Sequence, residues 1–382
     1  MKKIAIIGAG ISGLFIANLF KENPNYHLTI YEKNSSIELG ESYGVQLSIN
    51  SIKLLNEIGF NTLNDDEKFN PEKIDFYEIN QIKKICDLNI SKFNSESCKY
   101  TTLKRSKLVE FLKNRLDDDI IKYNHNIEKI ESNNDEVRLA FNKHDVEIYD
   151  HLVISDGVFS KSKLLISNNK IKPFYNNSVA IRGNISKDYL NKLDKKNISL
   201  FLGPDFHYVV YPLNRGKDFN FIGILKHKLT SKELDNYELF NQKPSIQDIK
   251  DRLANKISSS ILDNLENIKC FPVFVSKNLY RPKNNIFLIG DAFFAFSPSF
   301  AQGASQSIES ASELFDNIVN NKNYFYYKRV KKVKMINNRS KLNQFVFHLS
   351  NPVFIFFRNI ILKILTKNNK FLKNYLGKIY NN

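Results

Sequence analysis

The chain has 382 residues, and its 42% hydrophobic content supplies enough apolar material for the cores of two packed domains. Its three cysteines, Cys86, Cys98 and Cys270, are widely spaced and form no CxxC pair. This spacing excludes a disulfide framework and a zinc or iron–sulfur site, and it favours a reducing compartment. The cysteines are therefore expected to be small buried hydrophobic residues. The net charge of +16 is unevenly distributed, because residues 321–382 hold 14 Lys and Arg and no Asp or Glu. No uncharged apolar stretch of the sequence is long enough to span a membrane.

The first forty residues predict a strand, a glycine turn, an amphipathic helix and a second strand. The segment "KKIAIIGAGISGLFIANLF" places glycines directly after a short apolar run, and "HLTIYEKN" follows it. Lysines before an apolar run also occur in signal peptides, but this run is short and leads into the turn, so we interpret it as the first strand of a cytoplasmic protein. Gly8 permits the tight turn, Gly10 lets the backbone approach a pyrophosphate, and Gly13 lets the helix pack closely on the strand.

Glu32 stands at the end of the second predicted strand, 24 residues after Gly8. A carboxylate in this place accepts hydrogen bonds from the ribose of an adenine dinucleotide, whereas a 2′-phosphate would require a basic residue. The opening segment therefore predicts a site for FAD or NAD. The alternative is a βαβ unit with a purely structural role.

Later segments predict a second sheet and a ligand loop. Residues 199–213 and 219–225 are apolar or alternate in the manner of strands, and Tyr208 and Tyr211 are expected in the core. Residues 284–319 predict a buried strand, a Gly-Asp turn, a loop with proline, and a helix starting near Gly303. The aspartate of that turn either caps it or accepts hydrogen bonds from a polyol such as the ribityl chain of a flavin. The uncharged N-terminus of the helix would then face the part of the flavin where negative charge accumulates on reduction.

Residues 351–380 combine bulky apolar side chains with six cations. This pattern predicts a helix with two alternative settings. Either a basic amphipathic helix lies on an anionic membrane, or its apolar face packs on the domain and its lysines are solvated. Basic and aromatic residues also occur together in nucleic-acid binding segments, but no recognition motif is present, so no nucleic acid partner is expected.

Three segments carry a resemblance to a known family: the glycine fingerprint, "SDGVFSKSK" at 155–163, and "GDAFFAFSPSFAQGA" at 290–304. Together they resemble the motifs of class A FAD-dependent aromatic-ring monooxygenases, which include 4-hydroxybenzoate, salicylate and ubiquinone-pathway hydroxylases. Residues 203–221 are similar to the salicylate and 3-hydroxybenzoate branch, and the likeness covers about residues 1–350.

The resemblance implies an α/β fold with a Rossmann-like FAD-binding domain (GR2-type), an interleaved β-sheet substrate domain and C-terminal helices. The FAD-binding domain would comprise 1–70, 101–168 and 277–340, the substrate domain 71–100 and 169–276, and a basic helical segment 341–382. By position, FAD would be bound by Gly8, Gly10, Ser12, Gly13, Glu32, Arg105, Asp156, Gly157, Gly290, Asp291, Pro298, Gly303 and Ala304. Asp156 and Gly157 would also be near the reductant, and Pro298, Gly303 and Ala304 would line the flavin ring.

The activity that the resemblance implies is hydroxylation of a phenolic ring by way of a flavin C4a-hydroperoxide, with NAD(P)H as a transient co-substrate and O2 as oxidant. The chain fits, since it has no second GxGxxG, no paired cysteines and no tryptophan. No metal is predicted. His207 aligns with a histidine of the aromatic hydroxylases and is the candidate base; Arg182 is the candidate contact to flavin or substrate. The alternatives are a hydrogen-bonded histidine and an ordinary strand cation.

Four residues depart from the family pattern: Ser155 replaces alanine, Lys163 arginine, Phe294 histidine and Ala301 glycine. If position 301 requires a positive φ, alanine is strained there. Two other functions therefore stay open: a membrane-associated, ubiquinone-biosynthesis-type hydroxylase of a polyprenyl phenol, and an FAD-binding oxidoreductase or binding flavoprotein without hydroxylase activity. The expected location is cytoplasmic, with peripheral contact on the inner face of the membrane as the alternative.

Overall fold

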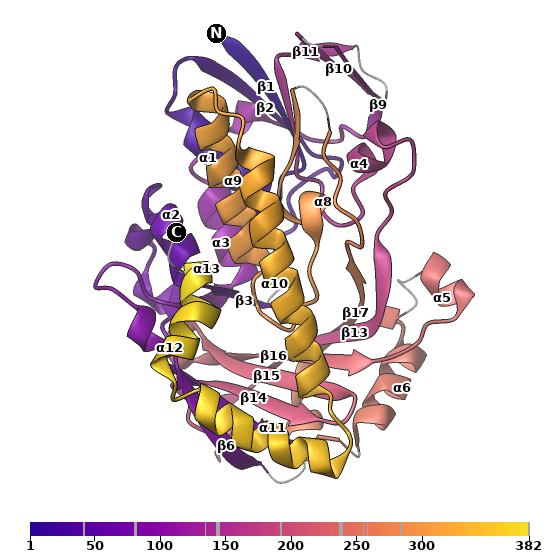
Figure 1. Ribbon diagram of the computed structural model, residues 1–382. Coiled ribbons are helices and arrows are strands. Elements are labelled where there is room, and N and C mark those ends of the chain that lie inside the picture. Colours follow the sequence, from indigo (N-terminus) through magenta and orange to yellow (C-terminus); the bar gives the residue numbers. More distant parts are fainter. Residues whose placement is uncertain are drawn as a thin grey trace.

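The chain folds into two large β-sheets, which lie one above the other in Figure 1 with long helices running beside them. This computed structural model describes every residue except 41–42, 80–81, 134, 143–145, 192, 237–239, 255, 258, 283–284 and 381–382. The combination of a parallel sheet, covering helices and a second sheet confirms the predicted α/β class.

The sheet nearest the N-terminus is parallel, with the strand order β18–β12–β1–β2–β8. Its strands are β1 (Lys2–Ile7), β2 (Tyr26–Tyr31), β8 (Ile121–Lys122), β12 (His151–Ile154) and β18 (Ile286–Leu288). Ile4, Ala5 and Ile6 of the central strand have no exposed surface. A parallel strand is covered on both faces, which accounts for the unbroken apolar run in the sequence. Strands from the start, the middle and the last third of the chain thus become neighbours.

The helices that cover this sheet carry the glycine turn and the predicted ligand loop. α1 (Ile11–Lys21) follows β1 and packs against α3 (Arg105–Lys113) and α9 (Gly303–Val319). α9 begins at Gly303, as the sequence predicts. The predicted Gly-Asp turn is wrong in detail, because these two residues begin a short helix, α8 (Gly290–Phe294). An aspartate in the first turn of a helix interacts favourably with its backbone N–H groups.

Shorter elements connect these units. Two small antiparallel sheets are formed by β3 (Gly44–Leu47), β7 (Thr101–Lys104) and β4 (Lys68–Phe69), and by β9 (Ile127–Ser132), β10 (Val137–Phe141) and β11 (Glu147–Tyr149). Short helices are α2 (Ile49–Asn56), α4 (Lys161–Ile166), α5 (Ser231–Asp235) and α7 (Ser259–Leu262).

The second large sheet has the strand order β17–β13–β16–β15–β14–β5–β6 and is antiparallel except for the pair β14–β5. Its strands are β5 (Lys73–Glu78), β6 (Lys83–Asn89), β13 (Phe174–Ile185), β14 (Ile198–Gly203), β15 (Phe206–Leu213), β16 (Asp218–Lys226) and β17 (Leu265–Val275). Alternate side chains face opposite sides. On β15, Phe206 and Tyr208 belong to the core that includes α6 (Lys243–Ala254), whereas His207 and Tyr211 line a cavity on the other face. Tyr208 and Tyr211 therefore both lie in the core as predicted, and Tyr211 also lines the cavity.

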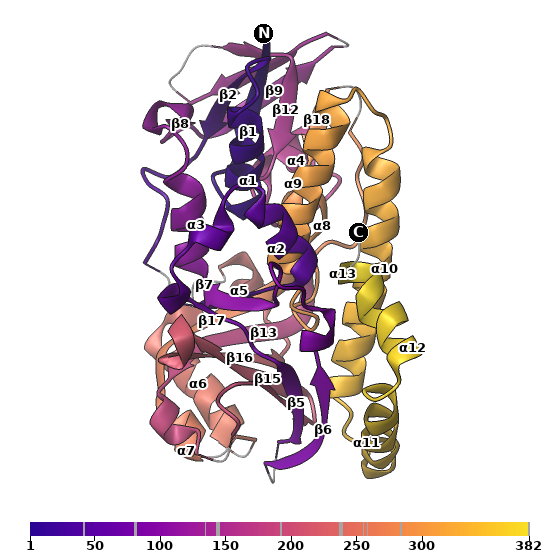
Figure 2. The same ribbon diagram turned by 90° about the vertical axis from the view of Figure 1, so that its left-hand side faces the viewer.

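Two helices, α10 (Phe325–Phe347) and α11 (Pro352–Leu365), lie on the opposite side of this sheet from α6, as Figure 2 shows. The chain then continues through α12 (Asn369–Leu372), a π-helical turn (Lys373–Gly377) and α13 (Lys378–Tyr380). Among the described residues, no helix combines the length and the apolar character needed to cross a bilayer.

A buried ion cluster fastens α10 to α9. The Arg329 guanidinium is 1% exposed, and its Nη1 lies 3.1 Å from Oε1 of Glu309 and 3.0 Å from Oε2 of Glu313. Nζ of Lys332 lies 3.2 Å from the same Glu309 oxygen. The two glutamates are four residues apart on α9 and so share the face that meets α10. The cluster explains why acidic residues occur on a helix that is otherwise buried there.

Candidate active site

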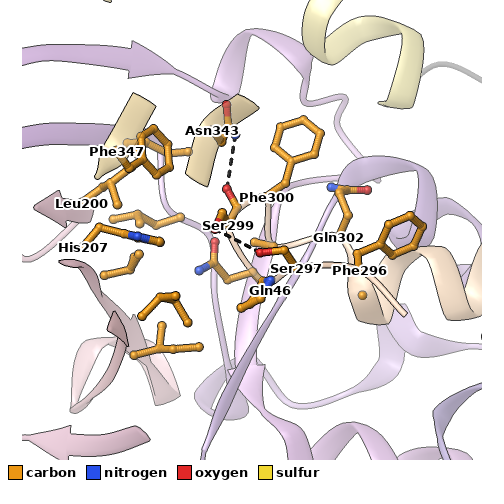
Figure 3. A pocket seen from close by; sticks show the side chains of 18 of the residues that line it. Gln46, Leu200, His207, Phe296, Ser297, Ser299, Phe300, Gln302, Asn343 and Phe347 are labelled. Atoms are coloured by element: carbon orange, nitrogen blue, oxygen red, sulfur yellow. Dashed lines mark hydrogen bonds between the residues drawn. The ribbon is translucent and has the colours of Figure 1, made fainter. Parts of the chain in front are cut away.

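A cavity of about 1160 Å³ lies between the loop before α9, the inner face of the seven-stranded sheet and helices α10 and α11. Figure 3 shows His207 and Leu200 on one side of it and Phe296, Ser297 and Gln302 on the other. Seven of the predicted site residues line it: Arg105, Arg182, His207, Asp291, Pro298, Gly303 and Ala304. The cavity therefore joins the predicted flavin loop to the sheet that carries the candidate base.

The glycine fingerprint forms the predicted turn between β1 and α1. Gly8 has a φ of +100°, and a Cβ atom on Gly13 would lie 2.1 Å from the carbonyl oxygen of Gly8, so the helix approaches the strand this closely only with glycine. A Cβ on Gly10, by contrast, would meet no atom within 4 Å. The turn thus leaves open space beside a helix N-terminus, which is the arrangement that accepts a pyrophosphate.

Two side chains extend this turn toward the other predicted site residues. The Ser12 hydroxyl oxygen would lie 2.7 Å from a Cβ on Gly290, so the start of α1 touches the start of α8. Glu32 accepts the backbone N–H of Ala9 at 3.0 Å through Oε2 and that of Asn34 at 3.0 Å through Oε1. Because each carboxylate oxygen can accept two hydrogen bonds, Glu32 retains acceptor capacity at the turn.

Asp291 and Lys163 place opposite charges beside α8, the aspartate at the cavity and the lysine buried. Nζ of Lys163 donates to the carbonyl of Ala292 at 2.8 Å, and the side chain is 3% exposed. Burial lowers the pKa of Lys163, and attraction to Asp156 and Asp291 opposes this shift. The Asp291 carboxylate is open to the cavity but surrounded by protein that displaces bulk water, so its pKa is raised, against the attraction of Lys163 and Arg105.

Asp156 belongs to the same region but is held differently. Its Oδ2 accepts the backbone N–H of Ser162 at 3.0 Å. Burial raises the pKa of Asp156, and hydrogen bonds from Ser160 and Ser162 oppose the rise. The neighbouring Gly157 has a φ of +81°, and a Cβ on it would meet no atom within 4 Å. Gly157 therefore borders open space, although neither it nor Asp156 lines the large cavity.

The loop before α9 carries a strained residue and an open helix N-terminus. Ala301 has a φ of +49°, and this positive φ is the backbone conformation that strains alanine. Its N–H donates to the carbonyl of Pro298 at 3.2 Å. Gly303 and Ala304 begin α9, whose first turn has no acidic residue, and a Cβ on Gly303 would meet no atom within 4 Å. The partial positive charge of this helix end thus faces the cavity and favours a ligand that carries negative charge.

Helix α10 supports this loop through polar residues that the sequence analysis missed. Asn343 donates to the carbonyl of Ser299 at 3.2 Å, as Figure 3 shows, and the Ser340 hydroxyl donates to the carbonyl of Ser297 at 2.6 Å. Ser297 in turn donates to Oε1 of Gln344 at 2.7 Å. Polar residues at three-residue and four-residue spacing in an otherwise partly apolar helix were the available signal.

Two of the departures from the family pattern have local partners. The Ser155 hydroxyl donates to the carbonyl of Ile7 at 2.8 Å and to that of Gly8 at 2.9 Å. It therefore ties β12 to the glycine turn. Phe294 is 4% exposed and packs against Phe296, with ring centroids 5.3 Å apart. It thus takes part in the core beside the loop.

His207 has a partner from a distant part of the chain. Its Nδ1 lies 2.7 Å from Nε2 of His348, which directly follows α10. Burial lowers the pKa of His207 well below its ordinary value and that of His348 to about 4. Both imidazoles are therefore neutral near pH 7, and the hydrogen bond leaves Nε2 of His207 available. Because the two residues are 141 positions apart, no sequence pattern linked them.

Arg182 lies on the cavity face of β13. Its guanidinium carbon is 5.7 Å from the ring centroid of Tyr43, whose hydroxyl donates to the carbonyl of Asn267 at 3.3 Å. Burial raises the pKa of Tyr211, and the charge of Arg182 opposes the rise. This part of the cavity wall thus places the Arg182 cation beside two phenol rings, Tyr43 and Tyr211. Among the described residues, no group of three or more His, Cys, Asp or Glu side chains is arranged to hold a metal ion.

No family model and no curated protein matches this sequence. Many solved structures do match. HpxO from Klebsiella pneumoniae complexed with FAD and uric acid is similar with a TM-score of 0.82 at 16% identity, over 99% of this chain and 96% of that chain. A salicylate hydroxylase substrate complex has a TM-score of 0.80 at 16% identity, over 100% and 95% of the two chains.

A third similar structure is 2,6-dihydroxypyridine-3-hydroxylase from Arthrobacter nicotinovorans, with a TM-score of 0.75 at 15% identity, over 92% of this chain and 96% of that one. All three likenesses extend over nearly the whole of both chains, so they concern the complete arrangement of sheets and helices. The chain therefore has the fold of the FAD-dependent aromatic-ring hydroxylases.

Proposed function

We propose that the protein is an FAD-dependent monooxygenase that uses NAD(P)H and O2 to hydroxylate a phenolic ring. One continuous cavity carries this proposal. Arg105, Asp291 and the N-terminus of α9 border it, and an apolar sheet face with His207 forms another wall. The first set of groups suits a flavin and the second an aromatic ring. The shared fold with HpxO complexed with FAD and uric acid supports this assignment.

The residues around the glycine turn fit FAD. Open space beside Gly10 and Gly157, the retained acceptors of Glu32, and a carboxylate at Asp291 open to the cavity are what a dinucleotide with a polyol chain requires. We assign the ADP half to Gly8, Gly10, Ser12, Gly13 and Glu32, the pyrophosphate and ribityl region to Arg105, Asp156, Gly157, Gly290 and Asp291, and the flavin ring to Pro298, Gly303 and Ala304.

FAD, when bound, supplies the electron transfer from NAD(P)H and the activation of O2. One oxygen atom becomes the ring hydroxyl, the other leaves as water, and NAD(P)H provides the two electrons. In the tautomer whose Nδ1 proton points at His348, Nε2 of His207 would accept the phenolic proton and make the ring more electron-rich. Arg182 holds the resulting phenolate by its charge, and the apolar sheet face excludes water.

We further propose that the chain acts in the cytoplasm and that segment 341–382 makes peripheral contact with the inner face of the membrane. The FAD-binding domain would comprise 1–70, 101–168 and 277–340, and the substrate domain 71–100 and 169–276. The strands from the latter two ranges are all in the seven-stranded sheet, which supports this division.

The test is the absorbance spectrum of the purified protein, followed by NAD(P)H oxidation with and without a panel of phenols under isotopically labelled O2. We expect bound flavin, phenol-stimulated oxidation and a labelled product. Failure to bind FAD after reconstitution would remove the cofactor assignment. Bound flavin without stimulated turnover would instead favour other redox chemistry, for which the strained Ala301 and the apolar Phe294 are the relevant departures.

A further inference from the structure

Helix α11 exposes its apolar face. Seven large apolar side chains on it are between 39% and 61% exposed: Val353, Phe354, Phe356, Phe357, Ile360, Ile361 and Ile364. Their spacing of three and four residues places them on one side of the helix. The side that faces the protein carries Arg358, which is 4% exposed, and Leu362 and Leu365, which line the cavity. Since a surface helix normally turns its apolar stripe to the core, this face lacks the covering expected for it.

The cavity opens within the same apolar region. Leu342 and Phe345, at the end of α10, are 53% and 67% exposed and extend the apolar face of α11. Five residues of this apolar region are both exposed and part of the cavity lining: Leu342, Phe345, Phe354, Phe357 and Ile361. A side chain with both properties stands at an opening. We call the exposed apolar residues of α11, together with Leu342 and Phe345, the α11 surface.

The charges around the α11 surface indicate what covers it. Residues 321–382 contain no acidic residue, and Lys363, Lys367, Lys370 and Lys373 are exposed in and just after α11. Apolar side chains beside lysines are the composition of helices that lie in the headgroup region of anionic bilayers. A second copy of the chain, docked symmetrically, would bring two such cationic regions together, which is unfavourable.

We propose that the α11 surface docks on an anionic lipid bilayer, and that the cavity takes from the bilayer an aromatic substrate with an apolar chain. The second half rests on the proposed hydroxylase activity, whereas the first does not. Because the opening lies inside the docked area, such a substrate would pass into the cavity without crossing water.

Docking is tested with the full-length protein loaded with FAD, by co-sedimentation with vesicles of phosphatidylcholine alone or mixed with phosphatidylglycerol. We expect binding to the mixed vesicles that weakens with salt. The double variant Phe356→Ser/Ile360→Ser changes side chains that are 61% and 39% exposed and do not line the cavity. Without the contacts that these two apolar side chains would make with the bilayer, binding to the vesicles should weaken by about tenfold or more.

The matched control is Val146→Ser/Ile148→Ser, which replaces two apolar residues that are 60% and 45% exposed, beside and within β11 at the other end of the molecule (Figure 1). It should bind vesicles like the wild type. Equal binding by the Phe356/Ile360 variant, or no binding of the wild type to anionic vesicles, would overturn the proposal. So would a dimer in light scattering that this variant converts to monomer, since the surface would then belong to a second copy.

Substrate delivery is measured separately, as NAD(P)H oxidation with an alkyl phenol held in the vesicles and with a water-soluble phenol. The Phe356→Ser/Ile360→Ser variant should lose most of the vesicle-dependent rate and keep the rate with the soluble phenol. Equal rates for both proteins with the vesicle-held phenol would refute delivery from the bilayer. If the proposed function itself is wrong, no phenol stimulates either protein, while the sedimentation result stands unchanged.

Discussion

Gly10 and Gly13 are three residues apart, and the same substitution to alanine should affect FAD binding at the first position and stability at the second. Gly10 has a φ of −84°, which alanine adopts without strain, and a Cβ there meets no atom within 4 Å. A Cβ on Gly13 would lie 2.1 Å from the backbone oxygen of Gly8, which cannot move without separating α1 from β1.

The magnitudes follow from these contacts. For Gly10→Ala, the poorer N-cap preference of alanine costs up to about 1 kcal/mol, and the reduced freedom of the unfolded chain offsets about 0.4–1 kcal/mol. The free energy of unfolding of the FAD-free protein should therefore change by less than about 0.5 kcal/mol. Gly13→Ala forces atoms into an occupied space and should cost about 3 kcal/mol or more.

Urea unfolding of the FAD-free protein measures the stability effects, and titration with FAD followed by flavin fluorescence measures binding. Gly10→Ala should fold normally but bind FAD at least about tenfold more weakly, because its methyl group occupies the space assigned to the pyrophosphate. Wild-type affinity for FAD in Gly10→Ala would refute the placement of the pyrophosphate at this turn. A fully stable Gly13→Ala would show that the contact between α1 and β1 is not as close as the structure has it.

Three further predictions concern strain, protonation and buried charge. Ala301→Gly should raise the free energy of unfolding by about 1 kcal/mol, because a positive φ strains alanine and not glycine; unchanged stability in urea would contradict the strain. The pKa values of His207 and His348 in the folded protein lie below the value near 6.5 of the unfolded chain. Between these pKa values the unfolded chain binds more protons than the folded protein, so stability should fall as pH drops from about 6.5 toward 4. This fall should be smaller in His207→Gln, and identical pH profiles would argue against two buried neutral imidazoles. Arg329→Met should cost about 3–5 kcal/mol, because Glu309 stays buried after losing its main partner; a loss below 1 kcal/mol in urea unfolding would show that the cluster is hydrated.

Local patterns allowed much of the fold to be predicted. The glycine turn depends on neighbours within a few residues of each other, so its strand, turn and helix could be placed from sequence. The start of α9 at Gly303 and the alternation along residues 206–213 were predictable for the same reason. The short helix at Gly290 was not, since the sequence pattern of a tight turn and that of a single helical turn are alike.

Amphipathic periodicity also left one choice open. The spacing of apolar residues in 352–365 indicated a helix with one apolar side, but two settings satisfied it, burial on the domain or exposure. Only the packed structure shows that Arg358 and its neighbours face the protein, while Phe356 and Ile360 face outward.

The sequence by itself determined the elements whose contacts are local, and with them the turn that binds a dinucleotide in related folds. Tertiary structure decided which groups meet: His207 with His348, Lys163 with the carbonyl of Ala292, and Ser340 with the loop at Ser297. The physical reason is that side-chain chemistry across a cavity depends on distances between residues far apart in the chain. Those distances are set by how sheets and helices pack as layers, and no repeat or spacing in the sequence records them.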